Sequence, residues 1–282
     1  MLMKECIHKK YILNGELEDC RSFDPCHLEE GISVYEVIRV INGRLLFLEE
    51  HYERLNTSLE LAGQGFKPEF PEFIRLLQLL LDANNETEGN IKIVINFSPA
   101  SEPCLLMYYI PHQYPSHREY SEGIALRTFQ FVREEPNKKI WRSAFRQKVR
   151  ELTSSGSIYE VLLVTPDGYI TEASRANIFF LKGDKLFTSP SGTVLAGITR
   201  KHIFSICKQQ EIQLFEKNIL FSELGTFSGA FITGTSPNVL PVRQIDDISY
   251  TVRHELVTRL MKAFDEVIDE YLSKSDQRKA LV

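Results

Sequence analysis

Runs of β-branched residues that end at tight-turn residues constrain the fold of this chain more than any other sequence feature. The run over residues 31–41 ends at Asn42-Gly43, a dipeptide typical of two-residue hairpin turns. Shorter runs between residues 159 and 188 end at Pro166-Asp167-Gly168 and at Lys182-Gly183-Asp184, which favour turns as well. The pattern predicts strands joined by short turns, with an antiparallel meander over residues 159–188.

Two segments of the first third carry apolar residues at helical spacing instead. The first begins at Glu49 with acidic residues in its first turn, and the second covers residues 71–83. Two further strands are expected at residues 91–97 and 105–110. Mixed strands with helices on one side predict the α+β class.

A segment without periodicity separates two halves of the chain that differ in their pattern of predicted strands and helices. Residues 111–122 hold Pro, His, Tyr and Ser without periodicity, which is typical of a linker. We therefore expect an N-terminal α/β domain of residues 1–115 and a larger C-terminal domain of residues 123–282. Besides the meander, the second domain is expected to hold a helix near residues 198–210, a strand at 229–233 and a closing helix near 252–272.

Composition excludes several classes of function. The chain has 282 residues and a formal net charge of −5, which gives no support for binding nucleic acid or an anionic membrane surface. No apolar run approaches the roughly 18 residues of a membrane-spanning helix. The five cysteines are scattered and odd in number, and the first residues do not form a secretory signal, so we expect free thiols in the cytoplasm. The dispersed histidines predict no metal site.

Three segments are suited to hold a phosphate. Gly197-Ile198-Thr199-Arg200 stands where a helix is expected to begin, and a helix start offers unpaired N–H groups and a positive dipole end. Thr233-Gly234-Thr235-Ser236 follows an apolar strand, where a glycine lets backbone amides converge on an anion. Arg54 could bind a phosphate through two N–H groups. Taken singly, each has a simpler interpretation: a helix cap, an ordinary turn and a surface arginine.

One carboxylate and one amine complete the candidate chemistry. Glu172 is expected on the inward face of a strand, where it needs a partner such as a protonated ring nitrogen or, alternatively, Arg175. Lys138 and Lys139 are adjacent, so on an extended backbone only one of them would enter a pocket. The chain contains no dinucleotide-binding glycine motif, no P-loop and no Gly-x-Ser-x-Gly motif, so its sequence does not support nucleotide-dependent redox chemistry or hydrolysis by a catalytic triad.

The order and spacing of these segments resemble the class IV aminotransferases, the pyridoxal-phosphate enzymes of fold type IV. The resemblance runs from about residue 20 to residue 245. It rests on Val34-Tyr35-Glu36-Val37-Ile38-Arg39, Glu50-His51-Tyr52-Glu53-Arg54-Leu55, Tyr159-Glu160-Val161-Leu162-Leu163, Gly168-Tyr169-Ile170-Thr171-Glu172, Asn177-Ile178-Phe179, Leu195-Ala196-Gly197-Ile198-Thr199-Arg200 and Thr233-Gly234-Thr235-Ser236.

The resemblance implies a role for each candidate. The Schiff-base lysine is expected to be Lys139, because 160 − 139 = 21 residues separate it from Glu160; Lys138 gives 22 and stays an alternative. The family commonly has Asn three residues after this lysine, where this chain has Arg142. Glu172 would bind the ring nitrogen of pyridoxal 5'-phosphate. The other implied cofactor residues are Arg54, Asn177, Ile198, Thr199 and Thr235, and the implied substrate residues are Tyr35 and Ser236.

The same resemblance sets the expected function and assembly. It implies a transaminase acting on an amino acid and a 2-oxo acid, in a homodimer whose C-terminal domain is built around a barrel-like antiparallel sheet and carries the cofactor lysine. Residues 95–100 lack the arginine and histidine of the D-amino acid branch, and Thr235-Ser236 favours a transaminase. The alternatives are an aminodeoxychorismate lyase, which forms 4-aminobenzoate and pyruvate, and a pyridoxal-phosphate carrier without turnover.

Overall fold

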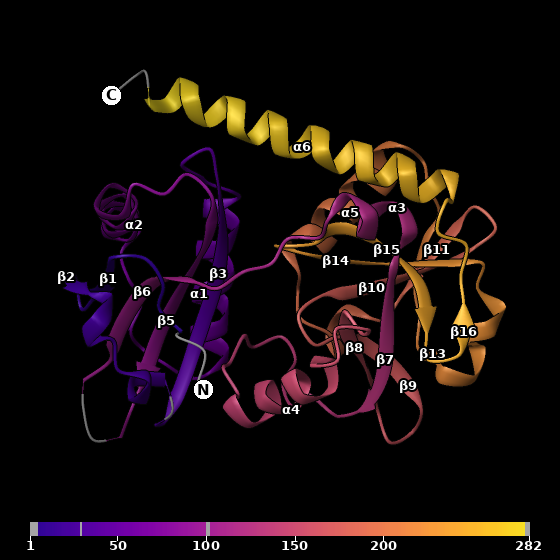
Figure 1. Cartoon of the computed structure of the whole chain (residues 1–282), viewed down its shortest axis with the longest axis horizontal. Coiled ribbons are helices and arrows are strands. Elements are labelled where there is room, and N and C mark those ends of the chain that lie inside the picture. The colour runs from indigo at the N-terminus through magenta and orange to yellow at the C-terminus, as the bar shows by residue number, and fades with distance from the viewer. Residues whose placement is uncertain (1–4, 29, 100–101, 280–282) are drawn as a thin grey trace. The chain divides into compact units, whose positions relative to one another are not determined.

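The computed structural model describes residues 5–28, 30–99 and 102–279. The chain divides into two compact units (Figure 1). Unit 1 holds the residues up to Gln113, the segment Lys138–Ser143 and the chain from Tyr271 onward; unit 2 holds Tyr114–Asn137 and Ala144–Glu270. Both units combine sheets with helices, so the α+β class is confirmed. The expected cofactor lysine, which we placed in the C-terminal half, therefore belongs to unit 1.

Unit 1 is built on a six-stranded sheet with helices on one face. Asn42 and Gly43 both have positive φ, so the predicted hairpin turn is present and β3 leads directly into β4. All neighbouring strands of this sheet are antiparallel. In the order β2-β1-β6-β5-β3-β4, the strands are β2 (Glu16–Asp19), β1 (Lys10–Leu13), β6 (Cys104–Ile110), β5 (Gly89–Phe97), β3 (Ile32–Ile41) and β4 (Arg44–Leu45).

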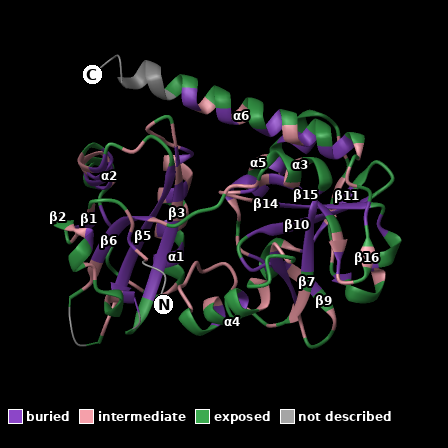
Figure 2. Cartoon of the chain, viewed as in Figure 1, coloured by how far each residue is buried: buried purple, intermediate pink, exposed green. Residues whose placement is uncertain are grey.

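Two helices supply the apolar layer over this sheet. They are α1 (Leu48–Leu61) and α2 (Phe70–Asn84), close to the predicted ranges. Leu55 and Leu59 of α1 pack with Leu77 of α2 and with Val34 and Ile38 of β3, all fully buried. Helical spacing therefore places one apolar stripe per helix on the sheet, and the strands remain buried beneath it (Figure 2).

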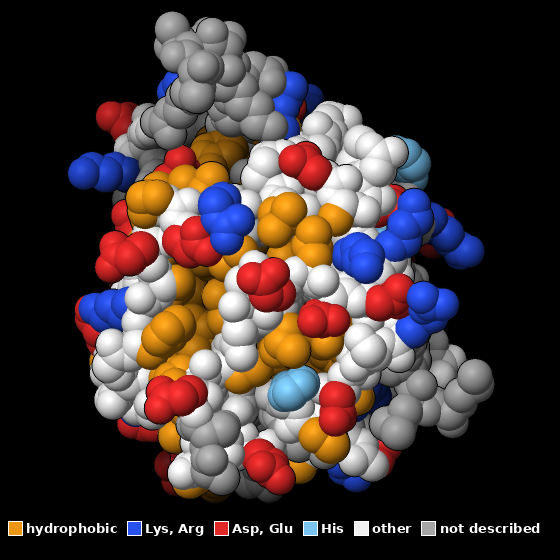
Figure 3. Space-filling view, turned by 90° about the vertical axis from the view of Figure 1, so that its left-hand side faces the viewer, with side chains coloured by type: hydrophobic (Ala, Val, Ile, Leu, Met, Phe, Trp, Pro, Cys, Tyr) orange, Lys and Arg blue, Asp and Glu red, His pale blue; other side chains and the backbone are white. Residues whose placement is uncertain are grey.

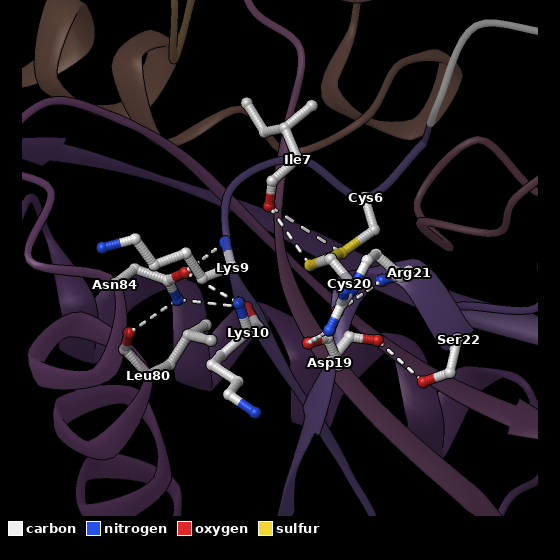
Figure 4. The surroundings of a disulfide bond; sticks show 10 residues. All are labelled: Cys6, Ile7, Lys9, Lys10, Asp19, Cys20, Arg21, Ser22, Leu80 and Asn84. Atoms are coloured by element: carbon white, nitrogen blue, oxygen red, sulfur yellow. Dashed lines mark hydrogen bonds and ion pairs between the residues drawn. A yellow bond between two sulfur atoms is a disulfide. The ribbon is translucent and has the colours of Figure 1, made fainter.

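The other face of the sheet holds a feature that the sequence analysis did not predict. Cys6 and Cys20 form a disulfide, with Cα atoms 6.0 Å apart (Figure 4). They meet because β1 and β2 form a hairpin whose turn is Asn14-Gly15, both at positive φ, and because the Cys20 amide donates to the Lys9 carbonyl. The expectation that all five thiols are free was therefore wrong for this pair.

Unit 2 is built on a ten-stranded sheet. Its path is β12-β11-β10-β14-β15-β7-β8-β9-β13, and β16 pairs with β15. The strands are β7 (Ile124–Gln130), β8 (Glu160–Val164), β9 (Tyr169–Ala173), β10 (Asn177–Lys182), β11 (Lys185–Thr188), β12 (Leu214–Glu216), β13 (Ile219–Leu220), β14 (Gly229–Gly234), β15 (Asn238–Ile245) and β16 (Ile248–Ser249). The helices are α3 (His117–Glu122), α4 (Ser143–Thr153), α5 (Ile198–Gln209) and α6 (Glu255–Lys279), the last of which continues into unit 1.

The larger sheet is mixed rather than wholly antiparallel. Strand β7 runs parallel to both β15 and β8, and β12 runs parallel to β11. The connection from β7 to β8 includes α4, and a crossover of that length permits a parallel pair. The expected meander is interrupted, because β9 pairs with β8 and β13 whereas β10 pairs with β11 and β14. A bend at Ser174, whose amide donates to the Val161 carbonyl, separates β9 from β10.

The segment expected to be a featureless linker also contains a helix. Helix α3 lies within residues 111–122 and begins with a reciprocal cap between Ser116 and Glu119. It is six residues long, too short for helical periodicity to reveal it. The chain passes from unit 1 to unit 2 just before this helix, between Gln113 and Tyr114.

Candidate functional site

Lys139 lies on the edge of the unit 1 sheet. The Tyr35 amide donates to the Lys139 carbonyl at 2.9 Å, and the Trp141 amide donates to the Ser33 carbonyl at 2.8 Å. These bonds continue the sheet beside β3, where β4 no longer pairs with it. The Lys139 Nζ lies 5.3 Å from the centroid of the Tyr35 ring. The structure thus brings together the predicted lysine and the predicted substrate tyrosine.

Tyr35 belongs to an aromatic cluster that surrounds a buried lysine. Tyr35 and Trp141 meet edge to face, with ring centroids 5.6 Å apart. Lys92, 1% exposed, places its Nζ 3.3 Å from the centroid of the Trp141 ring and donates to Glu5 at 2.7 Å. The sequence analysis missed this group, although a lysine between apolar residues of a buried strand is itself a signal of a buried cation. Through Trp141 the cluster fixes the segment that carries Lys139.

Arg54, the predicted phosphate ligand of unit 1, is bound to a carboxylate of the neighbouring strand. Its Nε and Nη2 donate to the two oxygens of Glu36 at 2.7 and 2.8 Å. His51, one helical turn before Arg54, lies with its Nδ1 2.8 Å from Glu36 Oε2. The Arg54 side chain is 10% exposed and its partner Glu36 is 0% exposed, so the interpretation of Arg54 as a surface arginine was wrong.

The charges of this group are set by burial and by one another. Burial alone would raise the pKa of Glu36, but the Arg54 guanidinium and the Lys139 ammonium outweigh it, and the pKa lies well below its usual range. Burial lowers the pKa of His51 despite the nearby carboxylate. An ionised Glu36 accepts hydrogen bonds only, which requires a neutral His51 to carry its proton on Nδ1.

In unit 2 the predicted carboxylate forms an ion pair. Glu172 is 3% exposed, and its Oε1 lies 3.1 Å from Nη1 of Arg133. Its Oε2 accepts from the Leu195 amide at 3.1 Å. The alternative partner, Arg175, instead pairs with Glu160 at 2.9 Å, because the bend after β9 turns it toward β8. Glu172 is therefore held against a cation, although the sequence did not indicate which one.

Asn177 joins this carboxylate to the start of α5. Its side-chain amide donates to Glu172 Oε2 at 3.4 Å and to the Leu195 carbonyl at 3.0 Å. A Cβ on Gly197 would lie 2.0 Å from its Oδ1, so any other residue at this position would force Asn177 to move. Gly197 is the N-cap of α5 and, lacking a side chain, makes no capping bond. The first-turn N–H groups, those of Ile198 and Thr199 among them, have no carbonyl partners inside the helix.

The second predicted phosphate segment follows β14. Thr235 and Ser236 lie in the turn between β14 and β15 and are half-buried. Thr233, just before them, is the register partner of Asn177 and so shares its face of the sheet. Within the described part of the chain, the buried Thr233 Oγ1 has no hydrogen-bond partner. A phosphate oxygen would satisfy such a hydroxyl.

The predicted residues thus fall into two sets, one in each unit. Unit 1 holds Lys139, Tyr35 and Arg54; unit 2 holds Glu172, Asn177, Ile198, Thr199, Thr235 and Ser236. Pyridoxal 5'-phosphate needs an amine for its aldehyde, an acid for its ring nitrogen and donors for its phosphate. Lys139 offers the amine, on an ordered sheet edge. Glu172 offers the buried acid. The start of α5 at Gly197 and the unsatisfied Thr233 hydroxyl offer donors for the phosphate.

The described residues contain neither a metal-ligand cluster nor a helix suited to span a membrane. No group of three or more His, Cys, Asp or Glu side chains lies close enough to hold a metal ion, over residues 5–28, 30–99 and 102–279. Over the same residues, no helix combines the length and apolar character that spanning a membrane would require.

Comparison with known proteins places the chain in a family. The profile described as amino-transferase class IV matches residues 33–245. D-alanine aminotransferase of Bacillus licheniformis is 28% identical over 253 residues, covering 84% of this chain and 88% of that protein.

Two solved structures share the fold. A branched-chain amino acid aminotransferase from Escherichia coli has a TM-score of 0.82 at 22% identity, covering 93% of this chain and 95% of that one. A Legionella pneumophila protein assigned as a 4-amino-4-deoxychorismate lyase has a TM-score of 0.77 at 21% identity, covering 86% and 93%. The profile match spans most of the chain, so this protein belongs to the class IV aminotransferase family.

Proposed function

We propose that this chain is a pyridoxal-phosphate-dependent aminotransferase that moves an amino group between an amino acid and a 2-oxo acid. The observation that carries the proposal is Lys139, whose backbone is bonded to Tyr35 and whose amine lies beside the Tyr35 ring. Because the flanking bonds to β3 fix this segment, the amine is presented from an ordered sheet edge rather than from a loop. Lys138 remains the alternative lysine.

The proposed reaction assigns each set of residues a task. When bound, pyridoxal 5'-phosphate supplies an electron sink for the electron pair left at the substrate α-carbon. Lys139 Nζ would hold the cofactor through its aldehyde carbon, with loss of water. Once the substrate amine has replaced it there, the freed Nζ would accept the α-proton and deliver it to that same carbon. Tyr35 and Ser236 would orient the substrate.

The remaining residues would hold charge. Glu172 would bind the protonated ring nitrogen and keep it positive, with Asn177 and Arg133 fixing the carboxylate. Arg54, Thr235, Thr199 and the Ile198 amide would bind the phosphate. These phosphate donors include the positively charged guanidinium of Arg54 and the N-terminus of helix α5, and together they suit a doubly negative phosphate.

A second candidate, aminodeoxychorismate lyase, uses the same lysine and cofactor. The fold similarity to the Legionella pneumophila protein favours keeping it. Thr235-Ser236 and the aminotransferase relative favour the transaminase. That relative carries D-alanine in its name, whereas residues 95–100 lack the expected basic pair, so substrate chirality has to be measured on both enantiomers.

The test is spectroscopic. Full-length protein loaded with pyridoxal 5'-phosphate should show a visible absorption band that shifts when an amino donor is added and returns with a 2-oxo acid. L-amino acids, D-amino acids and aminodeoxychorismate form the panel. A shift with aminodeoxychorismate alone, accompanied by pyruvate release, supports the lyase. A band without any shift indicates a carrier, and no band contradicts the proposal.

We also infer a homodimer. On the face of unit 1 shown in Figure 3, hydrophobic side chains gather between acidic and basic ones, and a second subunit would cover such a surface. The Cys6–Cys20 disulfide removes the free-thiol argument on which the expected cytoplasmic location rested. Light scattering on the purified protein should give twice the mass of the chain; a single-chain mass contradicts the dimer.

A further inference from the structure

A buried carboxylate outside the predicted site residues interacts with two of them. Glu36 lies on β3, fully buried, with four donors around its two oxygens. Oε1 accepts from Arg54 Nε, and Oε2 accepts from Arg54 Nη2, from the Val37 amide at 3.2 Å and from the His51 ring. A carboxylate held at this many points cannot rotate, so it fixes whatever it binds.

The first group that Glu36 fixes is the Arg54 guanidinium. A guanidinium is planar, and the two bonds to Glu36 use the edge formed by Nε and Nη2. The plane of the group and the direction of the Nη1 edge are then determined. Because a phosphate needs its donors at defined positions, Glu36 sets how Arg54 can receive one.

The second group, which Glu36 affects through its charge, is the Lys139 amine. The Lys139 backbone amide donates to Ser58 Oγ at 3.3 Å, which places this segment beside α1, the helix that carries Arg54 and His51. The Lys139 ammonium is among the charges that lower the pKa of Glu36. Coulomb attraction is mutual, so the Glu36 carboxylate favours the charged form of Lys139 by the same interaction. His51, kept neutral by burial, adds no opposing charge of its own.

The other groups around Lys139 act in the opposite direction. Arg54 on α1 is a cation, and Lys92 on β5 lies 5.6 Å from the same Tyr35 ring. Lys138 and Arg142 are cations on its own segment. Two other acids act on these cations: Glu5 pairs with Lys92, and Glu50 lies near Arg54. Glu36 is the acid that interacts with Lys139 itself, while Tyr35 presents its ring.

We propose that Glu36 is a positioning residue with two effects: it orients Arg54 toward the cofactor phosphate, and it sets the pH at which Lys139 reacts with the aldehyde. The inference rests on the proposed function. It makes the phosphate site and the lysine parts of one buried charge network rather than independent groups.

The experiment uses two aldehydes that differ only in the phosphate. Full-length protein freed of cofactor is incubated with pyridoxal 5'-phosphate or with pyridoxal across a pH series, and the lysine adduct is fixed with borohydride and quantified. The variants are Glu36→Gln, which removes the charge, and Glu36→Asp, which keeps it but shortens the side chain. Glu53→Gln is the matched control, an exposed acid on α1 next to Arg54.

Glu36→Gln should raise the dissociation constant of pyridoxal 5'-phosphate about tenfold or more, as expected on losing a charged hydrogen-bond pair. With pyridoxal, which has no phosphate, its adduct should form with a pH midpoint lower by about half a unit or more, because the amine has lost a stabilising negative charge. Glu36→Asp should weaken pyridoxal 5'-phosphate binding while leaving the pyridoxal midpoint within about 0.3 units of the wild type. Glu53→Gln should change neither.

The inference would be overturned if both Glu36 variants kept the wild-type pH midpoint and the wild-type affinity for pyridoxal 5'-phosphate. It would also be overturned if the pyridoxal midpoint of Glu36→Asp fell as far as that of a well-folded Glu36→Gln. If Glu36→Gln does not fold, the test rests on Glu36→Asp. That variant must bind pyridoxal 5'-phosphate more weakly than the wild type and keep the wild-type pH midpoint with pyridoxal. Circular dichroism establishes folding in each case. Failure of the wild type to form any adduct would instead contradict the proposed function, so the two failures are distinguishable.

Discussion

The Asn177 Oδ1 occupies the position that a side chain on Gly197 would need. Asn177 in turn binds Glu172 and the Leu195 carbonyl. A Gly197→Ala substitution should therefore displace Asn177 and the start of α5 together. We expect a loss of about 1–3 kcal/mol in the free energy of unfolding, as for other overpacked sites, and a smaller stabilisation by added phosphate.

Urea unfolding with and without inorganic phosphate measures both effects. Gly192→Ala is the control, because a Cβ there meets no atom within 4 Å. Equal stability and equal phosphate response in the two variants would show that the contact does not matter.

The buried His51 predicts how stability depends on pH. Its pKa is lowered in the folded state from an unfolded value of 6.5, so the unfolded chain takes up a proton first as the pH falls. The contribution is fully present above pH 6.5 and is lost as the pH falls from there toward the folded pKa, by at most about 1.4 kcal/mol per pH unit. The free energy of unfolding of His51→Gln should depend less steeply on pH over this range than that of the wild type, as measured by urea unfolding at several pH values. Parallel curves would refute a neutral buried His51.

The Cys6–Cys20 disulfide should stabilise unit 1. It joins residues 14 apart, and cross-linking a loop of about this length restricts the unfolded chain by about 3 kcal/mol. Cys20→Ser should lower the melting temperature, and dithiothreitol should have little further effect on that variant. Cys26→Ser, which removes an exposed cysteine outside the disulfide, is the control.

Alkylation of the unfolded, unreduced protein followed by mass spectrometry counts the thiols. Cys26, Cys104 and Cys207 should be labelled, and Cys6 and Cys20 should not. Labelling of all five would mean that the bond does not form under the conditions tested.

The Glu172–Arg133 ion pair should be costly to break from either side. Arg133 is 16% exposed on its side chain and Glu172 is 4%, so Glu172→Gln leaves a largely buried cation without its counter-charge. We expect a loss of about 1–3 kcal/mol in stability, and turnover lower on the order of a hundredfold, because a carboxylate that stabilises charge is gone.

A double-mutant cycle with Arg133→Gln separates the pair from its surroundings. The double variant should be more stable than the sum of the two single changes predicts. Strict additivity would show that the pair contributes nothing, whatever the activity.

Local patterns predicted the elements that are long and regular. Residues 31–41 and the helix from Glu49 have strong periodicity, and β3 and α1 match them. The Asn14-Gly15 turn carries the same signal as Asn42-Gly43, but its flanking strands are four residues each, and β2 has a single apolar residue. Short polar strands lack the alternation that identifies a strand, so this hairpin and the disulfide that it allows were missed.

The partners of the site residues were harder to predict than the residues themselves. Glu36 lies within a motif that the sequence analysis used, yet its bonds to residues 15 and 18 positions away depend on how α1 packs on β3. Arg133 lies in the loop after β7 and pairs with Glu172 on β9, 39 positions along the chain (172 − 133). Spacing along the chain identifies candidates, whereas tertiary packing decides which charges meet.

The account depends above all on which amine reacts with the aldehyde. Wild-type protein incubated with pyridoxal 5'-phosphate, reduced with borohydride, digested and analysed by mass spectrometry should carry the phosphopyridoxyl group on Lys139. Lys139→Ala should carry none, and Lys138→Ala should be labelled like the wild type. A group found on Lys138, or its persistence in Lys139→Ala, would contradict the assignment.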